Sequence, residues 1–142
     1  MNVRPVLIVE DSDEDFEAMR WAMRRLGRHD PLERCCDGDE ATERLRDRDR
    51  PWPRVVLLDL NLPGTDGLEV LAFIRRDPQL RSLPVVVLST SASEEDVNAC
   101  YDLGVNAYLI KPVNFEQFTE QLRVTLDFWL DLARLPEPPE RP

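Results

Sequence analysis

The chain has 142 residues, which is enough for one compact domain of ordinary size and too few for two. Its 28 acidic and 18 basic residues give a net charge of -10, and such a field repels nucleic acid and anionic membrane surfaces, so we expect neither as a partner. No apolar run approaches the roughly 20 residues that span a bilayer, and no signal-peptide pattern opens the chain, so we expect a cytoplasmic protein.

Short apolar runs alternate with segments of helical period along the chain. Runs of this kind are typical of strands buried on both faces of a parallel sheet, because such strands are joined by crossover helices. Strict alternation of five strands with five helices predicts one doubly wound α/β domain. The predicted strands cover residues 6–9, 32–36, 55–60, 85–88 and 107–110.

The first three predicted helices carry apolar residues at helical spacing, and the fourth is marked by its ends. The first ends at Gly27, and the fourth covers residues 94–103 between Ser93, which starts a capping box with Asp96, and Gly104. The residues of the first three helices that we expect to face the core are Phe16, Met19, Met23 and Leu26, then Ala41 and Leu45, then Leu68, Leu71 and Ile74.

The fifth predicted helix has apolar residues on more than one side. A helix that covers one face of a sheet needs one apolar stripe, formed here by Phe115, Phe118, Leu122, Leu126 and Trp129. A second set comprises Val124, Phe128, Leu132 and Leu135. Either the terminal helix is tightly wrapped, or its second face meets another subunit. The end LPEPPERP cannot continue a helix, so we expect a domain over residues 1–135 and a proline-rich arm over 136–142.

The cysteines and the histidine form no catalytic pattern. Cys35, Cys36 and Cys100 are odd in number and lack the spacing of metal ligands, so we expect small, half-buried packing residues. His29 lies between predicted elements, and we expect a loop residue without a chemical role.

Polar residues stand at the carboxyl ends of four of the predicted strands. They are Glu10 and Asp11, then Asp59, then Ser89 and Thr90, then Lys111. In a doubly wound sheet the ligand crevice lies beyond the carboxyl ends of the strands, so these residues are expected to converge.

Three crowded carboxylates repel one another unless a hard divalent cation lies between them, and Mg²⁺ (or Mn²⁺) is the expected occupant. The cation would neutralise the acids and bind a phosphoryl oxygen, which leaves Asp59 as the nucleophile. Lys111 would pair with the phosphoryl oxygens, and the Ser89 hydroxyl would donate a hydrogen bond to another.

The segments VLIVEDSDED, VVLLDLNLPGTDGLEVL, PVVVLSTS and GVNAYLIKP resemble, in order, the motifs of the CheY-like receiver domains of two-component response regulators. The resemblance covers about residues 5–125 and implies a flavodoxin-like (βα)5 sandwich with strand order 2-1-3-4-5. It implies a phosphoacceptor at Asp59, with metal ligands from Glu10, Asp11, Asp59 and the backbone carbonyl of Asn61. It also implies a switch pair of Ser89 and Tyr108, phosphoryl-pocket neighbours at Thr90 and Pro112, and a cis bond between Lys111 and Pro112.

A narrower resemblance concerns IRRDPQLRSLPVVVLSTSASEED, DLGVNAYLIKPV and DFWLDLARLP, which are similar to the stand-alone receivers associated with bacterial phytochromes. It implies a phytochrome-type sensor histidine kinase as the phosphoryl donor. It also implies a homodimer formed through the fourth helix, fifth strand, fifth helix and C-terminal segment. The expected function is a stand-alone response regulator in a phosphorelay, which signals through altered protein contacts.

Such a receiver is not a turnover enzyme, although we expect it to assist its own phosphorylation and dephosphorylation. Two residues depart from the commonest receiver pattern. Ser89 replaces the more frequent threonine and keeps its hydroxyl, so we expect a mild effect. Thr90 stands where many receivers have alanine or glycine, and its β-branched side chain predicts slow dephosphorylation.

Two other functions are weighed against this one. A haloacid-dehalogenase-like phosphatase also attacks phosphate with a strand-end aspartate, but it needs a second acid two residues later, where this chain has Asn61, and a cap domain. A receiver fold used as a phosphorylation-independent scaffold is expected to lose the nucleophile, the lysine or an acid. All of these are present here.

Overall fold

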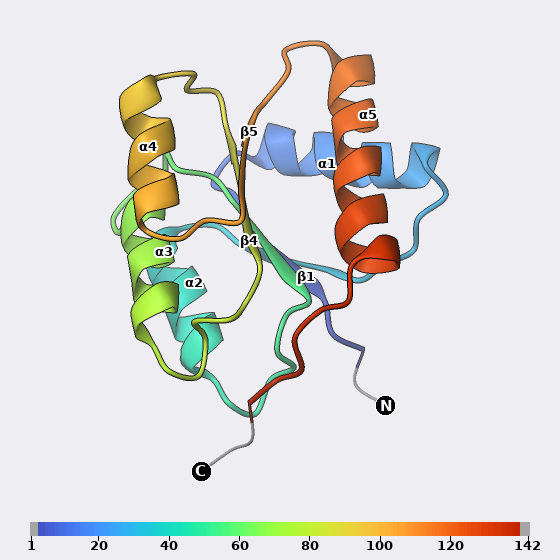
Figure 1. Cartoon of the computed structure of the whole chain (residues 1–142). Coiled ribbons are helices and arrows are strands. Elements are labelled where there is room, and N and C mark those ends of the chain that lie inside the picture. The colour runs from blue at the N-terminus through green and yellow to red at the C-terminus, as the bar shows by residue number, and fades with distance from the viewer. Residues whose placement is uncertain (1–2, 140–142) are drawn as a thin grey trace.

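The computed structural model describes residues 3–139, which form one parallel five-stranded sheet with helices on both faces (Figure 1). The strand order β2-β1-β3-β4-β5 confirms the predicted doubly wound arrangement. The strands are β1 (Val6–Val9), β2 (Leu32–Cys35), β3 (Val55–Leu58), β4 (Val85–Ser89) and β5 (Ala107–Ile110). The helices are α1 (Asp13–Arg25), α2 (Gly38–Arg46), α3 (Gly67–Arg76), α4 (Glu94–Asp102), α5 (Phe115–Leu126) and a π-helical turn, η1 (Asp127–Leu132).

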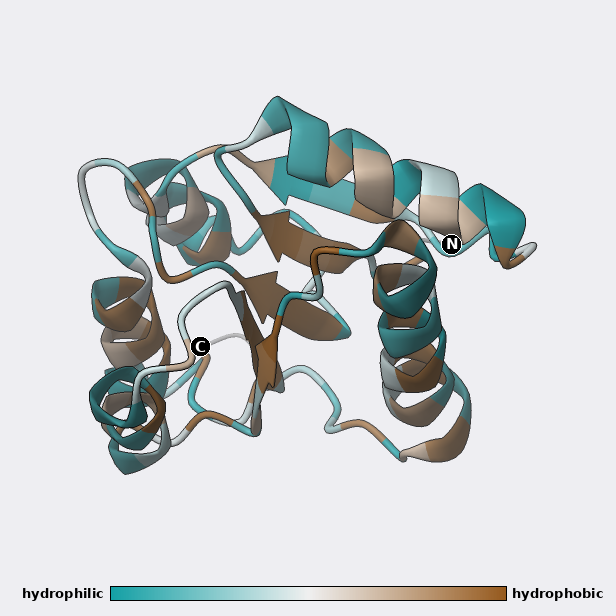
Figure 2. Cartoon of the chain, turned by 90° about the horizontal axis from the view of Figure 1, so that it is seen from above, coloured by the Kyte–Doolittle hydropathy of each residue, from teal (hydrophilic) through white to brown (hydrophobic). Residues whose placement is uncertain are grey.

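The helices cover the sheet as two layers. Helices α1 and α5 lie on one face, and α2, α3 and α4 lie on the other, as Figures 1 and 2 show. Alternate residues of β1 enter opposite cores, since Leu7 and Val9 belong to one buried cluster and Val6 and Ile8 to the other. The strands are therefore apolar on both faces, which explains their unbroken apolar runs.

The register of the sheet brings the strand ends to one edge. Val9, the last residue of β1, lies beside Cys35 of β2 and Leu58 of β3. Ser89, the last residue of β4, lies beside Ile110 of β5. The residues that follow these strands therefore leave the sheet together.

Each α-helix begins at a residue whose side chain accepts a hydrogen bond from a backbone N–H of the first turn. These caps are Ser12, Asp37, Asp66, Ser93 and Asn114. Gly27 and Gly104 follow α1 and α4 with φ values of 68° and 96°, which confirms the predicted helix ends. In α3 the buried set includes Val70, whereas Leu68 is half-buried at the margin of the core.

The second apolar face of the last helix is exposed. Leu122 and Leu126 are buried against the sheet, while Val124, Phe128 and Leu132 are 53%, 45% and 77% exposed. The backbone widens into the π-helical turn η1 after Leu126, a change that the apolar spacing does not predict.

Side chains bond part of the outer edge of β5. The Tyr101 hydroxyl of α4 accepts a hydrogen bond from the Tyr108 N–H at 3.2 Å. The Gln121 side-chain amide of α5 donates to the Ile110 carbonyl at 2.9 Å. Both neighbouring helices thus use a side chain to bond the outer backbone of this strand.

The cysteines differ from one another more than expected. Cys35 and Cys100 are buried, and burial raises the pKa of their thiols to about 12 and about 11, whereas Cys36 is exposed just beyond β2. The expectation that all three are half-buried is therefore wrong, because the strand ends one residue early and Cys36 turns outward.

His29 is exposed in the loop before β2, as expected. None of the helices among residues 3–139 is long and apolar enough to cross a membrane.

Candidate functional site

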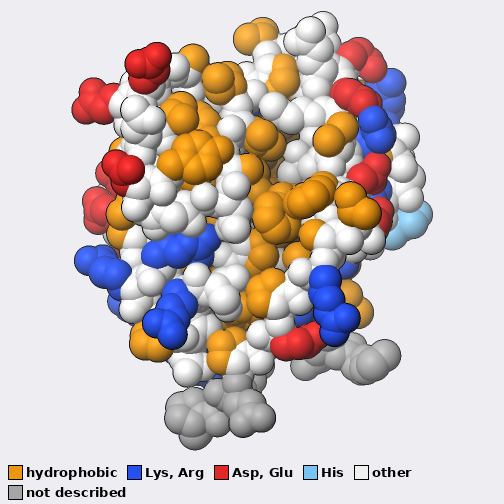
Figure 3. Space-filling view, in the orientation of Figure 1, with side chains coloured by type: hydrophobic (Ala, Val, Ile, Leu, Met, Phe, Trp, Pro, Cys, Tyr) orange, Lys and Arg blue, Asp and Glu red, His pale blue; other side chains and the backbone are white. Residues whose placement is uncertain are grey.

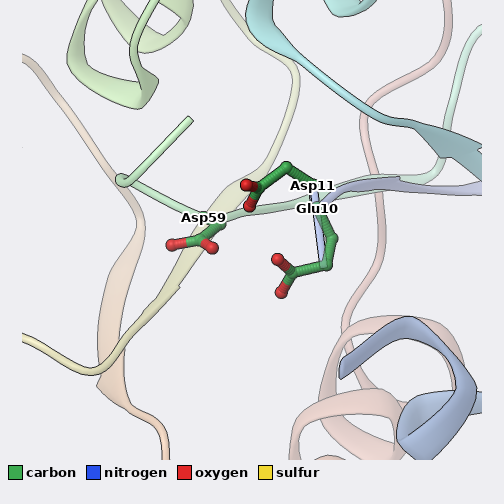
Figure 4. A group of neighbouring side chains, drawn as sticks. All are labelled: Glu10, Asp11 and Asp59. Atoms are coloured by element: carbon green, nitrogen blue, oxygen red, sulfur yellow. The ribbon is translucent and has the colours of Figure 1, made fainter. Parts of the chain in front are cut away.

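Three carboxylates converge where β1 and β3 end (Figure 4). Glu10 and Asp11 follow β1, and Asp59 follows β3. One oxygen atom from each carboxylate lies within 4.8 Å of the corresponding atoms of the other two. Glu10 and Asp59 are only 4% and 8% exposed, while Asp11 is exposed to solvent. The predicted acidic cluster is thus present, with one open side.

Lys111 reaches this cluster from the end of β5. Its Nζ atom lies 2.6 Å from Glu10 Oε1, 3.1 Å from Asp15 Oδ2 and 3.5 Å from Asp59 Oδ2. Asp15 was not among the predicted site residues. The signal that could have identified it is the acidic first turn of α1, which follows the two strand-end acids closely, although Asp13 and Glu14 share that signal.

The electrostatics of the cluster follow from its burial. Burial raises the pKa of Glu10 to about 7, although the hydrogen bond and charge of Lys111 oppose this rise. For Lys111, burial disfavours the charged form, but the hydrogen bond to Glu10 and the charge of Asp59 outweigh it and raise its pKa. One lysine therefore faces several carboxylates, and negative charge is left in excess.

The donor set fits a divalent cation. All three groups offer carboxylate oxygens, which hard cations such as Mg²⁺ and Mn²⁺ prefer, and a cation would relieve the repulsion among them. The excess of negative charge around Lys111 favours such an ion in addition to the lysine. The cluster is accordingly a candidate divalent-metal site.

Two hydroxyl groups meet at one residue of the loop after β4. Ser89 is fully buried at the end of β4, and its Oγ accepts a hydrogen bond from the Ser91 N–H at 3.1 Å. The half-buried Tyr108 donates its hydroxyl to the Ser91 carbonyl at 2.8 Å. Ser91 therefore connects the two predicted switch residues, a role that nothing in its sequence position indicates. Thr90, which lies between Ser89 and Ser91 in the sequence, is exposed.

The loop after β3 closes tightly around the aspartate. The Asn61 N–H donates to Asp59 Oδ1 at 3.2 Å, while the Asn61 side chain is exposed. A Cβ atom on Gly67 would lie 2.4 Å from the carbonyl oxygen of Asp59, so only glycine fits there without displacing backbone. The first residue of α3 thereby fixes the backbone that carries Asp59.

The bond between Lys111 and Pro112 corrects one expectation. The receiver resemblance implies a cis bond here, whereas the peptide bonds of residues 3–139 include no cis form. The trans form is ordinarily favoured by about 0.5 to 1 kcal/mol, and Lys111 reaches Glu10 without the cis form. Pro112 lies beside the cluster with Glu10, Asp15 and Lys111, lining a pocket of about 260 Å³ between α1 and α5.

The amino-acid sequence is similar to those of known proteins. A family model described as the response regulator receiver domain matches residues 6–123. The "Probable methanogenesis regulatory protein FilR2" of Methanothrix harundinacea (strain 6Ac) is 42% identical over 136 residues, which are 94% of this chain and 88% of that protein. "Response regulator Rcp1" of Synechocystis sp. (strain ATCC 27184 / PCC 6803 / Kazusa) is 39% identical over 135 residues, 92% of each protein.

Solved structures agree with this placement. The structure of the Mn²⁺-bound form of Rcp1 has a TM-score of 0.87 at 38% identity. The match covers 94% of this chain and 99% of the Rcp1 chain. The phosphorylated cyanobacterial phytochrome response regulator RcpA has a TM-score of 0.86 at 39% identity, with the same coverage. The family match, the identities and the shared fold together show that the chain belongs to the receiver-domain family of response regulators.

Proposed function

We propose that Asp59 accepts a phosphoryl group from the phosphohistidine of a sensor histidine kinase. A carboxylate oxygen of Asp59 forms the new bond to phosphorus, the phosphorus–nitrogen bond breaks, and the histidine nitrogen keeps the electron pair. The observation that carries this proposal is the position of Asp59, which is buried within the acidic cluster and 3.5 Å from the Lys111 ammonium. Phosphoryl transfer needs mainly positioning and charge neutralisation, and both are available there.

Glu10, Asp11 and Asp59, with the backbone carbonyl of Asn61, would hold Mg²⁺ (or Mn²⁺). When bound, the ion supplies positive charge to the acids and the phosphoryl oxygens. The convergence of the three carboxylates supports this assignment, as does the Mn²⁺-bound structure of the similar protein Rcp1.

Lys111 would exchange part of its contact with Glu10 for a phosphoryl oxygen, since its pKa keeps it charged. The Ser89 hydroxyl would donate a hydrogen bond to a second oxygen of the phosphoryl group. Through these groups the chain assists its own phosphorylation and dephosphorylation. Pro112 and the exposed Thr90 lie at the margin of the phosphoryl pocket, and the β-branched Thr90 would hinder the approach of water.

Signal output would begin at Ser89 and pass through Ser91. If the Ser89 hydroxyl turns to the phosphoryl group, the Ser91 N–H loses its acceptor. The Ser91 carbonyl is already bonded to Tyr108, so a shift of this loop changes the position of the Tyr108 ring and of β5. Tyr108→Ala should therefore leave phosphorylation of Asp59 intact and uncouple it from partner or dimer affinity. Affinity that still responds to phosphorylation in this variant would exclude the route.

The surface that would carry the output is apolar. Figure 3 shows hydrophobic side chains gathered along β5 and between α4 and α5. The exposed members from β5 onward include Ile110, Val124, Phe128 and Leu132. We propose that this face, with the C-terminal segment beside it, forms a homodimer, since neighbouring exposed apolar side chains often mark a protein–protein interface. Light scattering with and without a phosphoryl donor measures the oligomeric state, and a monomer under both conditions would exclude the dimer.

The phosphoryl donor would be a kinase of the phytochrome type, because RcpA, which is similar along most of its length, is a phytochrome response regulator. With a net charge of -10, the protein would signal through protein contacts and not through nucleic acid. Phosphotransfer from a panel of purified histidine kinases tests the donor directly, and failure of every phytochrome kinase in the panel would reject the assignment.

The acceptor is tested by mass spectrometry of the full chain with acetyl phosphate and Mg²⁺. The chain should gain the mass of one phosphoryl group, and Asp59→Asn should gain none. An unmodified wild-type chain under these conditions would favour the scaffold alternative. Repeated turnover of a phosphate ester would favour the phosphatase alternative.

A further inference from the structure

One arginine of β2 contacts the backbone that carries two of the clustered acids. Arg34 lies beside Ile8 of β1 in the register of the sheet. Its side chain reaches past the end of β1, where Glu10 and Asp11 follow the strand (Figure 4). There its Nε atom donates a hydrogen bond to the Glu10 carbonyl oxygen at 2.9 Å. Only 17% of the Arg34 side chain is exposed.

The Glu10 carbonyl depends on this side chain because β2 is short. The Glu10 N–H donates to the Cys35 carbonyl at 3.0 Å, which continues the ladder between β1 and β2. In a parallel ladder the next donor to the Glu10 carbonyl would be the N–H two residues beyond Cys35. The strand ends at Cys35, and Asp37, which stands at that position, caps α2. Arg34 therefore supplies a donor that the sheet does not.

Two further contacts fix the guanidinium of Arg34. It donates from Nη1 to Asp13 Oδ1, in the first residue of α1, at 2.8 Å. It also lies 5.0 Å from the centre of the Phe16 ring, in the geometry of a cation–π contact. Burial acts to lower the pKa of Arg34, but the hydrogen bond to Asp13 and the charges of Asp13 and Glu10 raise it. One side chain thus connects the end of β1 with the start of α1.

The turn between these two contacts carries acids of the cluster. Within it, the Ser12 N–H donates to Glu10 Oε2 at 3.2 Å, while Glu10 Oε1 faces Lys111. The direction of the Glu10 carboxylate therefore depends on the position of this turn. Asp11 lies in the same turn, so a displacement of the backbone would move both acids.

The contacts of Arg34 contribute little to the stability of the fold. Its Nη2 atom is buried and has no hydrogen-bond partner among residues 3–139, and an unpaired buried N–H is unfavourable for folding. The ion pair with Asp13, whose side chain is 89% exposed, is of the kind that adds little. Arg34 therefore acts more on the position of the turn than on folding.

We propose that Arg34 is a positioning residue of the divalent-metal site, because it holds the turn that carries Glu10 and Asp11. The inference rests on the proposed binding of Mg²⁺ (or Mn²⁺) by Glu10, Asp11 and Asp59. Removal of a side chain that orients metal ligands typically weakens metal binding by about 10- to 100-fold.

Charge and position predict opposite results when Arg34 is replaced. A positive charge close to the acids repels a cation, so the loss of this charge alone would tighten metal binding. Loss of the contact with the Glu10 carbonyl would let the turn move and would weaken metal binding. The direction of the change in affinity therefore distinguishes the two roles.

The test is calorimetric titration of the metal-free full chain with Mn²⁺. In Arg34→Met we expect the dissociation constant to rise about tenfold. Arg34→Lys restores the charge and an N–H donor, and should bind Mn²⁺ more tightly than the methionine variant. Arg20→Met removes an equal charge from an exposed ion pair on α1, and this matched control should keep the wild-type affinity.

Hydrogen exchange of the Ser12 amide gives a second measurement without metal. This amide bonds the Glu10 carboxylate, so its exchange should be faster in Arg34→Met, while exchange at Ile8 within β1 stays at the wild-type rate. General destabilisation would change both rates. Urea unfolding without metal shows whether each variant is folded, and Arg34→Gln, which should show the same weakening, replaces the methionine variant if that one is not.

The outcomes separate this inference from the proposed metal site. A wild-type chain that binds no Mn²⁺ would refute the metal site itself. If the wild-type chain binds Mn²⁺, an equal or lower dissociation constant in the uncharged variant would overturn the role of Arg34 alone. A lysine variant that binds more weakly than the methionine variant would overturn it too, as would unchanged exchange at Ser12.

Discussion

Replacement of Lys111 by methionine tests the electrostatic balance of the acidic cluster formed by Glu10, Asp11 and Asp59. The ammonium lies 2.6 Å from Glu10, and the two side chains are 12% and 6% exposed. Removal of one partner of such a buried pair costs about 3 to 5 kcal/mol. The contact with Asp15, which is 51% exposed, adds at most about 1 kcal/mol. Because Glu10 already has a pKa of about 7, it can take up a proton when the lysine is lost. We therefore expect a loss near the lower limit, about 3 kcal/mol at pH 7.

Magnesium should reduce this difference. A ligand present at 100 times its dissociation constant stabilises the folded state by about 2.7 kcal/mol. The variant should gain more than wild type from the same Mg²⁺ concentration, because the ammonium no longer competes for the carboxylates. Urea unfolding with and without Mg²⁺ measures both effects, and Lys111→Arg serves as the control that keeps the charge. A loss below about 1 kcal/mol without metal, or an equal loss in Mg²⁺, would refute the reasoning.

Three further predictions concern other parts of the chain. Gly67→Ala should destabilise the fold by about 1 to 3 kcal/mol, measured by urea unfolding, because its Cβ would lie 2.4 Å from the Asp59 carbonyl oxygen; a neutral effect would contradict this packing. In the native state at pH 8, a thiol reagent should modify Cys36 quickly and Cys100 very slowly. The neutral Cys100 thiol also stabilises the fold, a contribution present below pH 9.0 and lost as the pH rises towards about 11; equal labelling rates would contradict its burial. Thr90→Ala should shorten the half-life of the phosphorylated chain, measured by loss of the phosphoryl mass, and an unchanged half-life would exclude steric protection by Thr90.

The sequence predicted the fold closely because the strands and caps are local features. Apolar runs on both faces of a parallel sheet show no alternation, so they stand out from the helical spacing around them. Gly27 and Gly104 adopt positive φ, which few other residues tolerate, and therefore marked the ends of α1 and α4 correctly. The ends of β2, β3 and β4 were each missed by one or two residues, and beyond the shorter β2 Cys36 is exposed and not half-buried as expected.

The acidic cluster was predictable for a similar reason, since parallel strands all end at one edge. What the sequence did not show depends on side-chain reach across the fold. Asp15 contacts Lys111 because α1 starts beside the end of β5, and Ser91 connects Ser89 with Tyr108 through its backbone atoms, which any residue would have. The π-helical turn η1 and the contact of Arg4 with Pro136 likewise depend on the path of the chain and not on local pattern.

The outer edge of β5 is partly occupied, which bears on how two copies can join. An open strand can add to the strand of a neighbour and continue without end, whereas the hydroxyl of Tyr101 and the amide of Gln121 already bond one N–H and one carbonyl group of this one. These two bonds shorten the stretch of β5 that could pair with another strand, so they favour association of two receivers through side chains. Such contacts can form and separate with the state of the protein.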